Sequence, residues 1–151
     1  MDSETPCAPG ANESTIPSGA SKGNPVPWRG RGTLLVVDDD QAVRTVLQFL
    51  LERCGFTVLT AADGRSAMEI FRSRAGEIRL VLLDLVLPDI DGEAVFRLMR
   101  KICPCLRAIL CSGHLTETDL DARSAEGWAA VLRKPFWPEL LLQTVRTALE
   151  N

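Results

Sequence analysis

The stretch TLLVVDDDQAVR, residues 33–44, places four apolar residues directly before three acids. The run Leu34–Val37 is short, continuous and rich in β-branched residues, which is typical of a strand buried on both faces of a sheet. After the acids, apolar residues recur at helical spacing from Val43 to Leu51, and Gly55 suits the position just past a helix end. The stretch therefore predicts a strand followed by a helix over residues 41–54.

The same alternation continues to the end of the chain. Expected strands cover residues 56–60, 80–83, 108–111 and 129–132, and expected helices follow Asp63-Gly64 and Asp91-Gly92 and cover about 116–125 and 138–149. Five β-α units with short connections predict a doubly wound α/β fold, with a parallel sheet and helices on both faces. In such folds the site lies outside the carboxyl ends of the strands.

Composition limits the kind of protein. The 151 residues are 46% hydrophobic and 25% charged, with a net charge of −3 and a sequence pI of about 5.2. This balance does not favour a nucleic-acid partner, and the chain lacks an apolar run of the roughly 20 residues needed to span a membrane. The five cysteines are irregularly spaced and do not form a disulfide pattern. We expect a cytoplasmic protein with reduced thiols, with Cys54 and Cys111 in or near the core.

The first 32 residues differ from the rest of the chain. They hold five of the nine prolines and five of the eleven glycines, and they have no apolar periodicity. We interpret residues 1–32 as a disordered tail or linker and residues 33–150 as the folded domain. Trp28, near the end of this segment, is either docked on the domain or exposed.

Charged and polar residues follow the predicted strands. Asp38 and Asp39 follow the first strand, Asp84 the third, Ser112 the fourth and Lys134 the fifth. Three close carboxylates require either a raised pKa or a bound cation. Because the ligands are hard oxygens, Mg²⁺ or Mn²⁺ is favoured. A metal, an ammonium, a hydroxyl and a carboxylate nucleophile together match the needs of phosphoryl transfer.

These residues resemble a known family. Four motifs look like those of the receiver domain of two-component response regulators. They are DD after the first strand, LLDLVLPDIDG at residues 82–92, ILCSG at 109–113 and LRKPF at 132–136. The resemblance covers about residues 33–150, with every motif in order. It implies a flavodoxin-like (βα)5 fold with a five-stranded parallel sheet in the order 2-1-3-4-5.

The resemblance also implies roles for the acidic residues. Asp84 would accept a phosphoryl group from a phosphohistidine on a sensor histidine kinase or a histidine phosphotransfer protein. Asp39 and Asp84 would ligate Mg²⁺ directly, Asp38 would act mainly through a water, and the backbone carbonyl of Val86 would complete the protein ligands. Asp40 is better interpreted as the cap of the helix that follows.

On the same basis, Ser112 and Lys134 would bind the phosphoryl oxygens, and the Lys134-Pro135 bond would be cis. One position departs from the family pattern: Val131 stands where many receivers carry the aromatic residue that reports phosphorylation. Trp128, three residues earlier, is interpreted as a surface or interface aromatic rather than a substitute.

Two further features concern lifetime and output. Val86 and His114 lie two residues past Asp84 and Ser112, positions that influence phospho-Asp hydrolysis in this family, and we hypothesise that they tune it here. Output would come from the domain's own surface, where Phe136 and Trp137 are interpreted mainly as packing residues. The domain is expected to act on a downstream protein target and to be a monomer or weak dimer.

Other functions remain as alternatives at this stage. A hydrolase with an Asp nucleophile, of the haloacid-dehalogenase type, needs a second acid two residues after the nucleophile, where this chain has Val86. A degenerate receiver would bind partners without phosphorylation, which the full set of acids and Lys134 argues against. The chain could also be the receiver portion of a hybrid histidine kinase. We expect no enzymatic activity beyond phosphoryl acceptance and self-dephosphorylation.

Overall fold

A computed structural model describes residues 28–113 and 127–150 of the chain. The strands are β1 Thr33–Val37, β2 Thr57–Ala61, β3 Ile78–Asp84, β4 Ala108–Ser112 and β5 Ala130–Arg133. The helices are α2 Gln41–Arg53, α3 Gly64–Arg74, α4 Gly92–Ile102 and α6 Pro138–Glu150. The helix predicted at about 116–125 lies outside the described residues.

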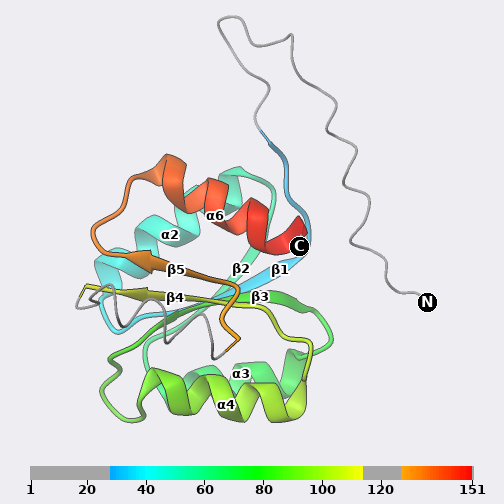
Figure 1. The fold of residues 1–151 in the computed structure, drawn as a ribbon, viewed down its shortest axis with the longest axis vertical. Helices are drawn as coiled ribbons and strands as arrows, with labels where there is room; N and C mark the ends of the chain where they lie inside the picture. The colour runs from blue at the N-terminus through cyan, green and yellow to red at the C-terminus, as the bar shows by residue number, and fades with distance from the viewer. Residues whose placement is uncertain (1–27, 114–126, 151) are drawn as a thin grey trace, which may run out of the picture.

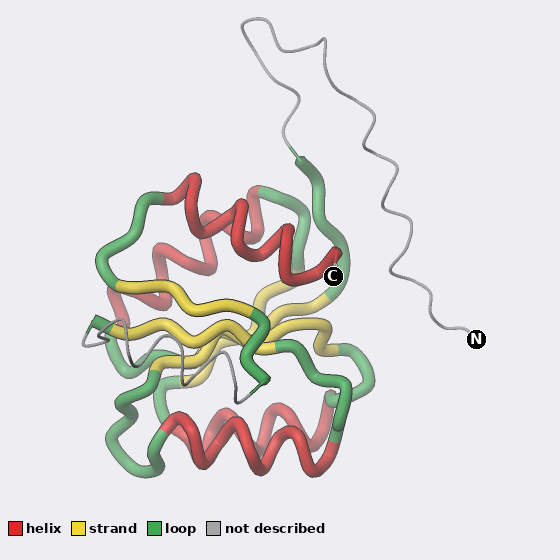
Figure 2. Tube along the Cα trace, viewed as in Figure 1, coloured by secondary structure: helices red, strands yellow, loops and turns green. Residues whose placement is uncertain are grey.

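All five strands pair in parallel, in the order β2-β1-β3-β4-β5. Figure 1 shows α2 and α6 covering one face of the sheet and α3 and α4 covering the other, and Figure 2 shows the same three layers by secondary structure. The predicted doubly wound fold and its strand order are therefore confirmed. Strand bounds differ from the predicted ones by one or two residues, because apolar periodicity does not mark where a ladder starts.

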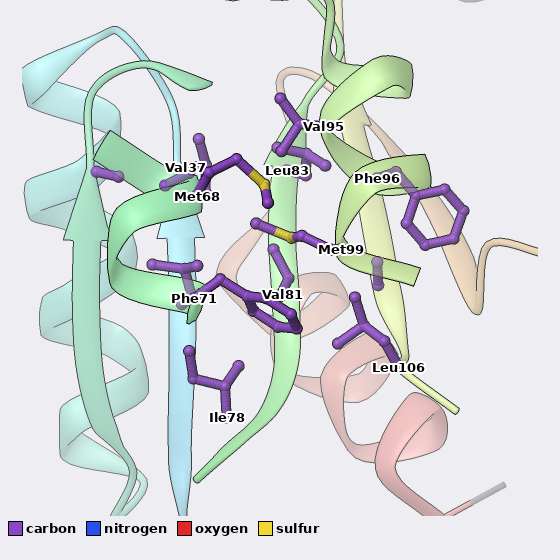
Figure 3. Packing of buried hydrophobic residues seen from close by; sticks show 14 of the residues in the cluster. Val37, Met68, Phe71, Ile78, Val81, Leu83, Val95, Phe96, Met99 and Leu106 are labelled. Carbon is purple, nitrogen blue, oxygen red and sulfur yellow. The ribbon is translucent and has the colours of Figure 1, made fainter. Parts of the chain in front are cut away.

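Each face of the sheet has its own core. One core joins alternate residues of β1, β3 and β4, such as Leu35, Val81 and Leu110, to apolar residues of α3 and α4. Figure 3 shows Met68 and Phe71 of α3 and Met99 of α4 packed over this face. The other core joins the opposite residues of the same strands to α2 and α6. The central strands are buried on both faces, as expected for the continuous run Leu34–Val37.

Local signals explain where three of the helices begin. Asp40, Asp63 and Asp91 are the N-cap residues of α2, α3 and α4, and each side chain accepts a backbone N–H of the first turn. After α2, Gly55 has φ of +106°, a left-handed conformation that glycine adopts without strain. The cap predicted for Asp40 and the helix end predicted at Gly55 are confirmed.

The segment 28–32 is packed against the domain. The Trp28 ring lies 5.5 Å from the Phe56 ring, centroid to centroid, and the Arg146 guanidinium lies 5.8 Å from the Trp28 ring centre. The Gly30 N–H donates to the Cys54 carbonyl at 2.7 Å. The predicted disordered segment ran to residue 32, but the packed region begins at Trp28. Residues 1–27 lie outside the described part of the chain.

Two interpretations of aromatic residues are wrong. Trp128 is only 6% exposed and stacks on Phe96 of α4, with ring centroids 3.9 Å apart, so it is a core residue and not a surface aromatic. Trp137 is 77% exposed and does not pack, whereas Phe136 packs against the core as expected. Sequence spacing does not distinguish these aromatic residues, because the burial of each side chain depends on which helix packs against it. Cys111 is buried and Cys54 is half-buried, as predicted.

Candidate functional site

The register of the sheet brings the predicted site residues to the same edge of the sheet. Val37 pairs with Leu83, and Asp84 pairs with Cys111, so Asp38 and Asp84 leave the sheet side by side. Ser112 pairs with Arg133, the residue before Lys134. Carboxylate oxygens of Asp38, Asp39 and Asp84 all lie within 4.8 Å of one another. The expected convergence at the carboxyl ends of the strands is therefore present.

The loop that follows Asp84 depends on a glycine. A Cβ atom on Gly92 would lie 2.2 Å from the Asp84 carbonyl oxygen and 2.9 Å from Leu85 Cα. The Gly92 N–H donates to the Leu85 carbonyl at 2.9 Å, which brings the start of α4 back onto the end of β3. Glycine at this position thus allows a tight loop of seven residues, 85–91, beside the acid.

Lys134 lies closer to one acid than to the other. Its Nζ donates to Asp38 Oδ2 at 2.6 Å and to Asp84 Oδ2 at 3.4 Å. The side chain of Asp38 is 3% exposed, so this ion pair is largely shielded from water. The Lys134-Pro135 bond is cis, as predicted. Lys134 therefore links β5 to the end of β1 more tightly than to the end of β3.

The three carboxylates differ in the hydrogen bonds that they accept from the protein. Asp38 Oδ1 accepts the Asp40 N–H at 2.9 Å and Oδ2 accepts Lys134, so both oxygens have a protein donor. Among the described residues, the Asp84 carboxylate has only long contacts, to the Val86 N–H at 3.4 Å and to Lys134 at 3.4 Å. Asp39 is exposed, and within residues 28–113 and 127–150 its carboxylate has no protein hydrogen bond. Asp39 is thus the acid most available to a cation.

Burial and charge act in opposite directions on the central groups. Burial, together with the nearby Asp38 charge, raises the pKa of Asp84 above its ordinary value, although Lys134 and the Val86 N–H partly offset this. Burial lowers the pKa of Lys134, but Asp38 and Asp84 outweigh it and the net pKa is raised. Lys134 is therefore a stable ammonium, while Asp84 is a carboxylate that a second cation would stabilise.

The donor set is suited to a hard divalent cation. All three candidate ligands are carboxylates, which Mg²⁺ prefers. The adjacent Cys111 is not a competing ligand, because burial raises the pKa of its thiol to about 12 and keeps it neutral. The residues present therefore fit Mg²⁺ or Mn²⁺, as the sequence predicted.

Other predicted residues fall around this centre. Ser112 is 1% exposed at the end of β4, and Val86 is 61% exposed in the loop after Asp84. Val131 is half-buried in β5, so an aliphatic side chain occupies the expected aromatic position. His114 lies outside the described residues.

One residue at the site, Arg44, was not predicted from the sequence. Arg44 Nη1 donates to the Asp38 carbonyl oxygen at 2.7 Å, which holds the acidic turn against the first turns of α2. The spacing in the sequence could have indicated this contact. Arg44 is four positions past the Asp40 cap, so it lies one turn along α2 on the side of the helix that carries the cap.

The sequence model of the response regulator receiver domain matches residues 34–146. The chain belongs to the response regulator receiver family. It is thus a receiver domain of two-component signal transduction, as the motifs predicted.

Similar proteins agree with this assignment. The domain is 36% identical over 122 residues to the sensor kinase CckA of Brucella abortus, covering 81% of this chain and 13% of CckA. It is 37% identical over 125 residues to the transcriptional regulatory protein SphR of Synechococcus elongatus, covering 78% and 49%. The chain thus spans about half or less of these relatives.

A solved structure agrees as well. A chain of the CheX–CheY–BeF3–Mg²⁺ complex from Borrelia burgdorferi superposes with a TM-score of 0.73 at 25% identity, covering 82% of this chain and 90% of that one. Receiver domains generally use Mg²⁺ and interact with sensor kinases and downstream targets. Across the described ranges, no helix combines the length and hydropathy required to cross a membrane.

Proposed function

We propose that this receiver domain accepts a phosphoryl group on Asp84, from the phosphohistidine of a sensor kinase or phosphotransfer protein, in a Mg²⁺-dependent reaction. The observation that carries the proposal is the convergence of Asp38, Asp39 and Asp84 with a single ammonium, Lys134. An acidic cluster that one ammonium only partly compensates costs stability at the end of a buried sheet, so its presence is best explained by a cation and a phosphoryl group that it would bind.

Each residue of the site would have its own role in binding the metal or the phosphoryl group. Asp39 and Asp84, with the Val86 carbonyl, would hold the metal directly, and Asp38 would reach it through water because both its oxygens already have protein donors. When bound, Mg²⁺ neutralises charge on the carboxylates and on the phosphoryl oxygens. Lys134, whose Nζ lies 3.4 Å from Asp84 Oδ2, would pair with the phosphoryl group, and the Ser112 hydroxyl would donate to one of its oxygens.

The transfer itself needs no other catalyst from this chain. A carboxylate oxygen of Asp84 attacks phosphorus, the phosphorus–nitrogen bond of the phosphohistidine breaks, and the imidazole keeps the electron pair of that bond. The product is an acyl phosphate on Asp84. The position two residues later, where a hydrolase would need an acid, carries the exposed aliphatic Val86, which cannot protonate a leaving group. We therefore infer that the domain does not turn over phosphomonoesters.

Intact mass measurement after incubation with acetyl phosphate and Mg²⁺ tests the proposal. We expect one acid-stable, base-labile phosphoryl adduct, which is lost in Asp84→Asn and in the presence of EDTA. Asp40→Ser is the matched control, because it alters the neighbouring acid but keeps a side-chain cap for α2. An adduct that persists in Asp84→Asn, or that forms equally with EDTA, contradicts the proposal. Turnover of p-nitrophenyl phosphate would favour a hydrolase.

A further inference from the structure

The first turn of α3 is capped by two carboxylates from different parts of the chain. Asp63, the local cap, accepts the Ser66 N–H at 2.7 Å. Asp89, 25 positions past Gly64, accepts the Gly64 N–H at 2.8 Å and the Arg65 N–H at 2.9 Å, one on each oxygen. Asp89 thus completes a cap that Asp63 only begins.

Asp89 is held in this orientation by its own loop. Its Oδ1 also accepts the Ile90 N–H at 2.8 Å. These backbone donors, led by Gly64, hold the pKa of Asp89 below its ordinary value, so the carboxylate stays ionised beside the positive end of the α3 dipole. The contact is a charge-assisted clamp rather than a loose surface contact.

The clamp leaves no room between helix and loop. A Cβ atom on Gly64 would lie 3.0 Å from Ile90 Cβ, 3.0 Å from Val95 Cγ2 and 3.3 Å from Asp89 Oδ1. A glycine at the helix start therefore lets the loop approach closely enough for Asp89 to reach two backbone N–H groups.

The clamped loop is the one that follows the acceptor. It starts at Leu85, next to Asp84, and carries Val86, whose N–H donates to Asp84 Oδ1. On the other side, α3 follows Ala61, whose carbonyl accepts the Asp38 N–H at 3.1 Å. Asp89 thus connects the loop after β3 to the helix after β2, and the last residue of β2 is itself bonded to the acidic turn after β1.

We propose that Asp89 is a positioning residue for the metal site: by clamping loop 85–91 to α3, it fixes the Val86 carbonyl relative to Asp39 and Asp84 and so sets Mg²⁺ affinity. This inference rests on the proposed function for the identity of the metal ligands. It assigns a role to an exposed acid that neither binds metal nor touches the phosphoryl group.

The test compares Asp89→Ala with Asp63→Ala, because both remove a carboxylate from the same helix end but only Asp89 belongs to the loop. Mg²⁺ titrations, followed by the NMR amide shifts of residues 84–86 at a temperature where every variant is folded, give the dissociation constants. Loss of a residue that orients metal ligands typically weakens binding by 10-fold or more, so we expect about a tenfold rise in Kd for Asp89→Ala. Asp63→Ala should stay within about twofold of the wild type, as expected for a substitution that removes only a helix cap.

Two further variants make the test sharper. Asp89→Asn keeps one acceptor oxygen and should bind Mg²⁺ with intermediate affinity. Gly64→Ala would displace its neighbours Ile90, Val95 and Asp89 by a few tenths of an ångström without removing a charge, and should weaken Mg²⁺ binding in the same direction as Asp89→Ala. Hydrogen exchange of the Gly64 and Arg65 amides should accelerate in Asp89→Ala and not in Asp63→Ala.

The outcomes separate this inference from the proposed function. If the wild type neither binds Mg²⁺ nor forms an adduct, the proposed function fails and this inference fails with it. If the wild type does both but Asp89→Ala and Asp63→Ala bind Mg²⁺ equally well, Asp89 is only a helix cap and this inference alone is overturned.

Discussion

The two ends of the parallel sheet use charge in opposite ways. At the carboxyl ends of the strands, three carboxylates lie together, Lys134 pairs with two of them, and within the described residues the Asp39 carboxylate has no hydrogen bond. At the amino ends, arginine side chains bind backbone carbonyls: Arg79 donates to Arg31 at 2.6 Å, and Arg107 donates to Ala148 and Leu149 at 2.8 and 3.0 Å.

The amino end is held by contacts within the protein, whereas the described part of the carboxyl end has more carboxylates than ammonium groups. Arg107 satisfies carbonyls in the last turn of α6 and interacts favourably with its dipole. Trp28 adds an aromatic cover at the same end, against Phe56 and Arg146. At the carboxyl end, by contrast, the described residues keep an excess of negative charge that a bound cation would offset. Changes at the two ends should therefore have separable effects.

The largest effect is expected for Lys134→Ala. If Lys134 pairs with the phosphoryl group as proposed, losing its ammonium should slow adduct formation by about 10²-fold, the usual effect of removing one stabilising donor. Because Asp38 stays buried without its partner, unfolding free energy should also fall by about 3 kcal/mol. Acetyl phosphate kinetics and urea unfolding measure the two effects. Lys101→Ala, at an exposed lysine of α4, should change neither; equal effects of both variants would contradict a special role for Lys134.

A smaller effect, confined to stability, is expected for Trp28→Ala. A half-buried tryptophan that packs on Phe56 should contribute about 2 kcal/mol, less than the 3–5 found for fully buried aromatics. Adduct formation per folded molecule should not change, because Trp28 lies at the opposite end of the sheet. Trp137→Ala is the control: this side chain is 77% exposed, and its loss should cost less than about 0.5 kcal/mol. Slower phosphorylation of Trp28→Ala without loss of stability would show that the two ends are coupled.

The smallest effect is a pH dependence at Asp84. Because burial and Asp38 raise the pKa of Asp84 in the folded state, its contribution to stability is greatest below the ordinary Asp pKa and is lost as the pH rises through the raised value. Asp84→Asn, which does not titrate, should be more stable than the wild type at neutral pH without metal. The difference should shrink as the pH falls toward about 4, the ordinary pKa of Asp.

Urea unfolding in EDTA at several pH values measures this difference, since acids that do not interact with Asp84 titrate equally in both proteins and cancel. A variant less stable than the wild type at neutral pH would mean that Asp84 gains more from Lys134 than it loses by burial. Added Mg²⁺ should stabilise the wild type and not the variant, which provides an internal control.

The sequence by itself determined the order of the strands and helices along the chain and the edge of the sheet at which the acids lie. Continuous apolar runs marked the strands, aspartates marked three helix starts, and parallel topology requires that residues following neighbouring strands meet. Asp38, Asp39, Asp84 and Lys134 could therefore be placed together without coordinates.

Only the tertiary structure decided which atoms pair. Lys134 lies nearer Asp38 than Asp84, Trp128 stacks on Phe96 and not in solvent, and Asp89 reaches a helix 25 positions earlier in the chain. Sequence periodicity reports the face on which a residue lies, because it depends on rotation per residue within one element. Contacts between elements depend on the spacing of helix against sheet, which is set by packing of the whole core and is not encoded in any single stretch.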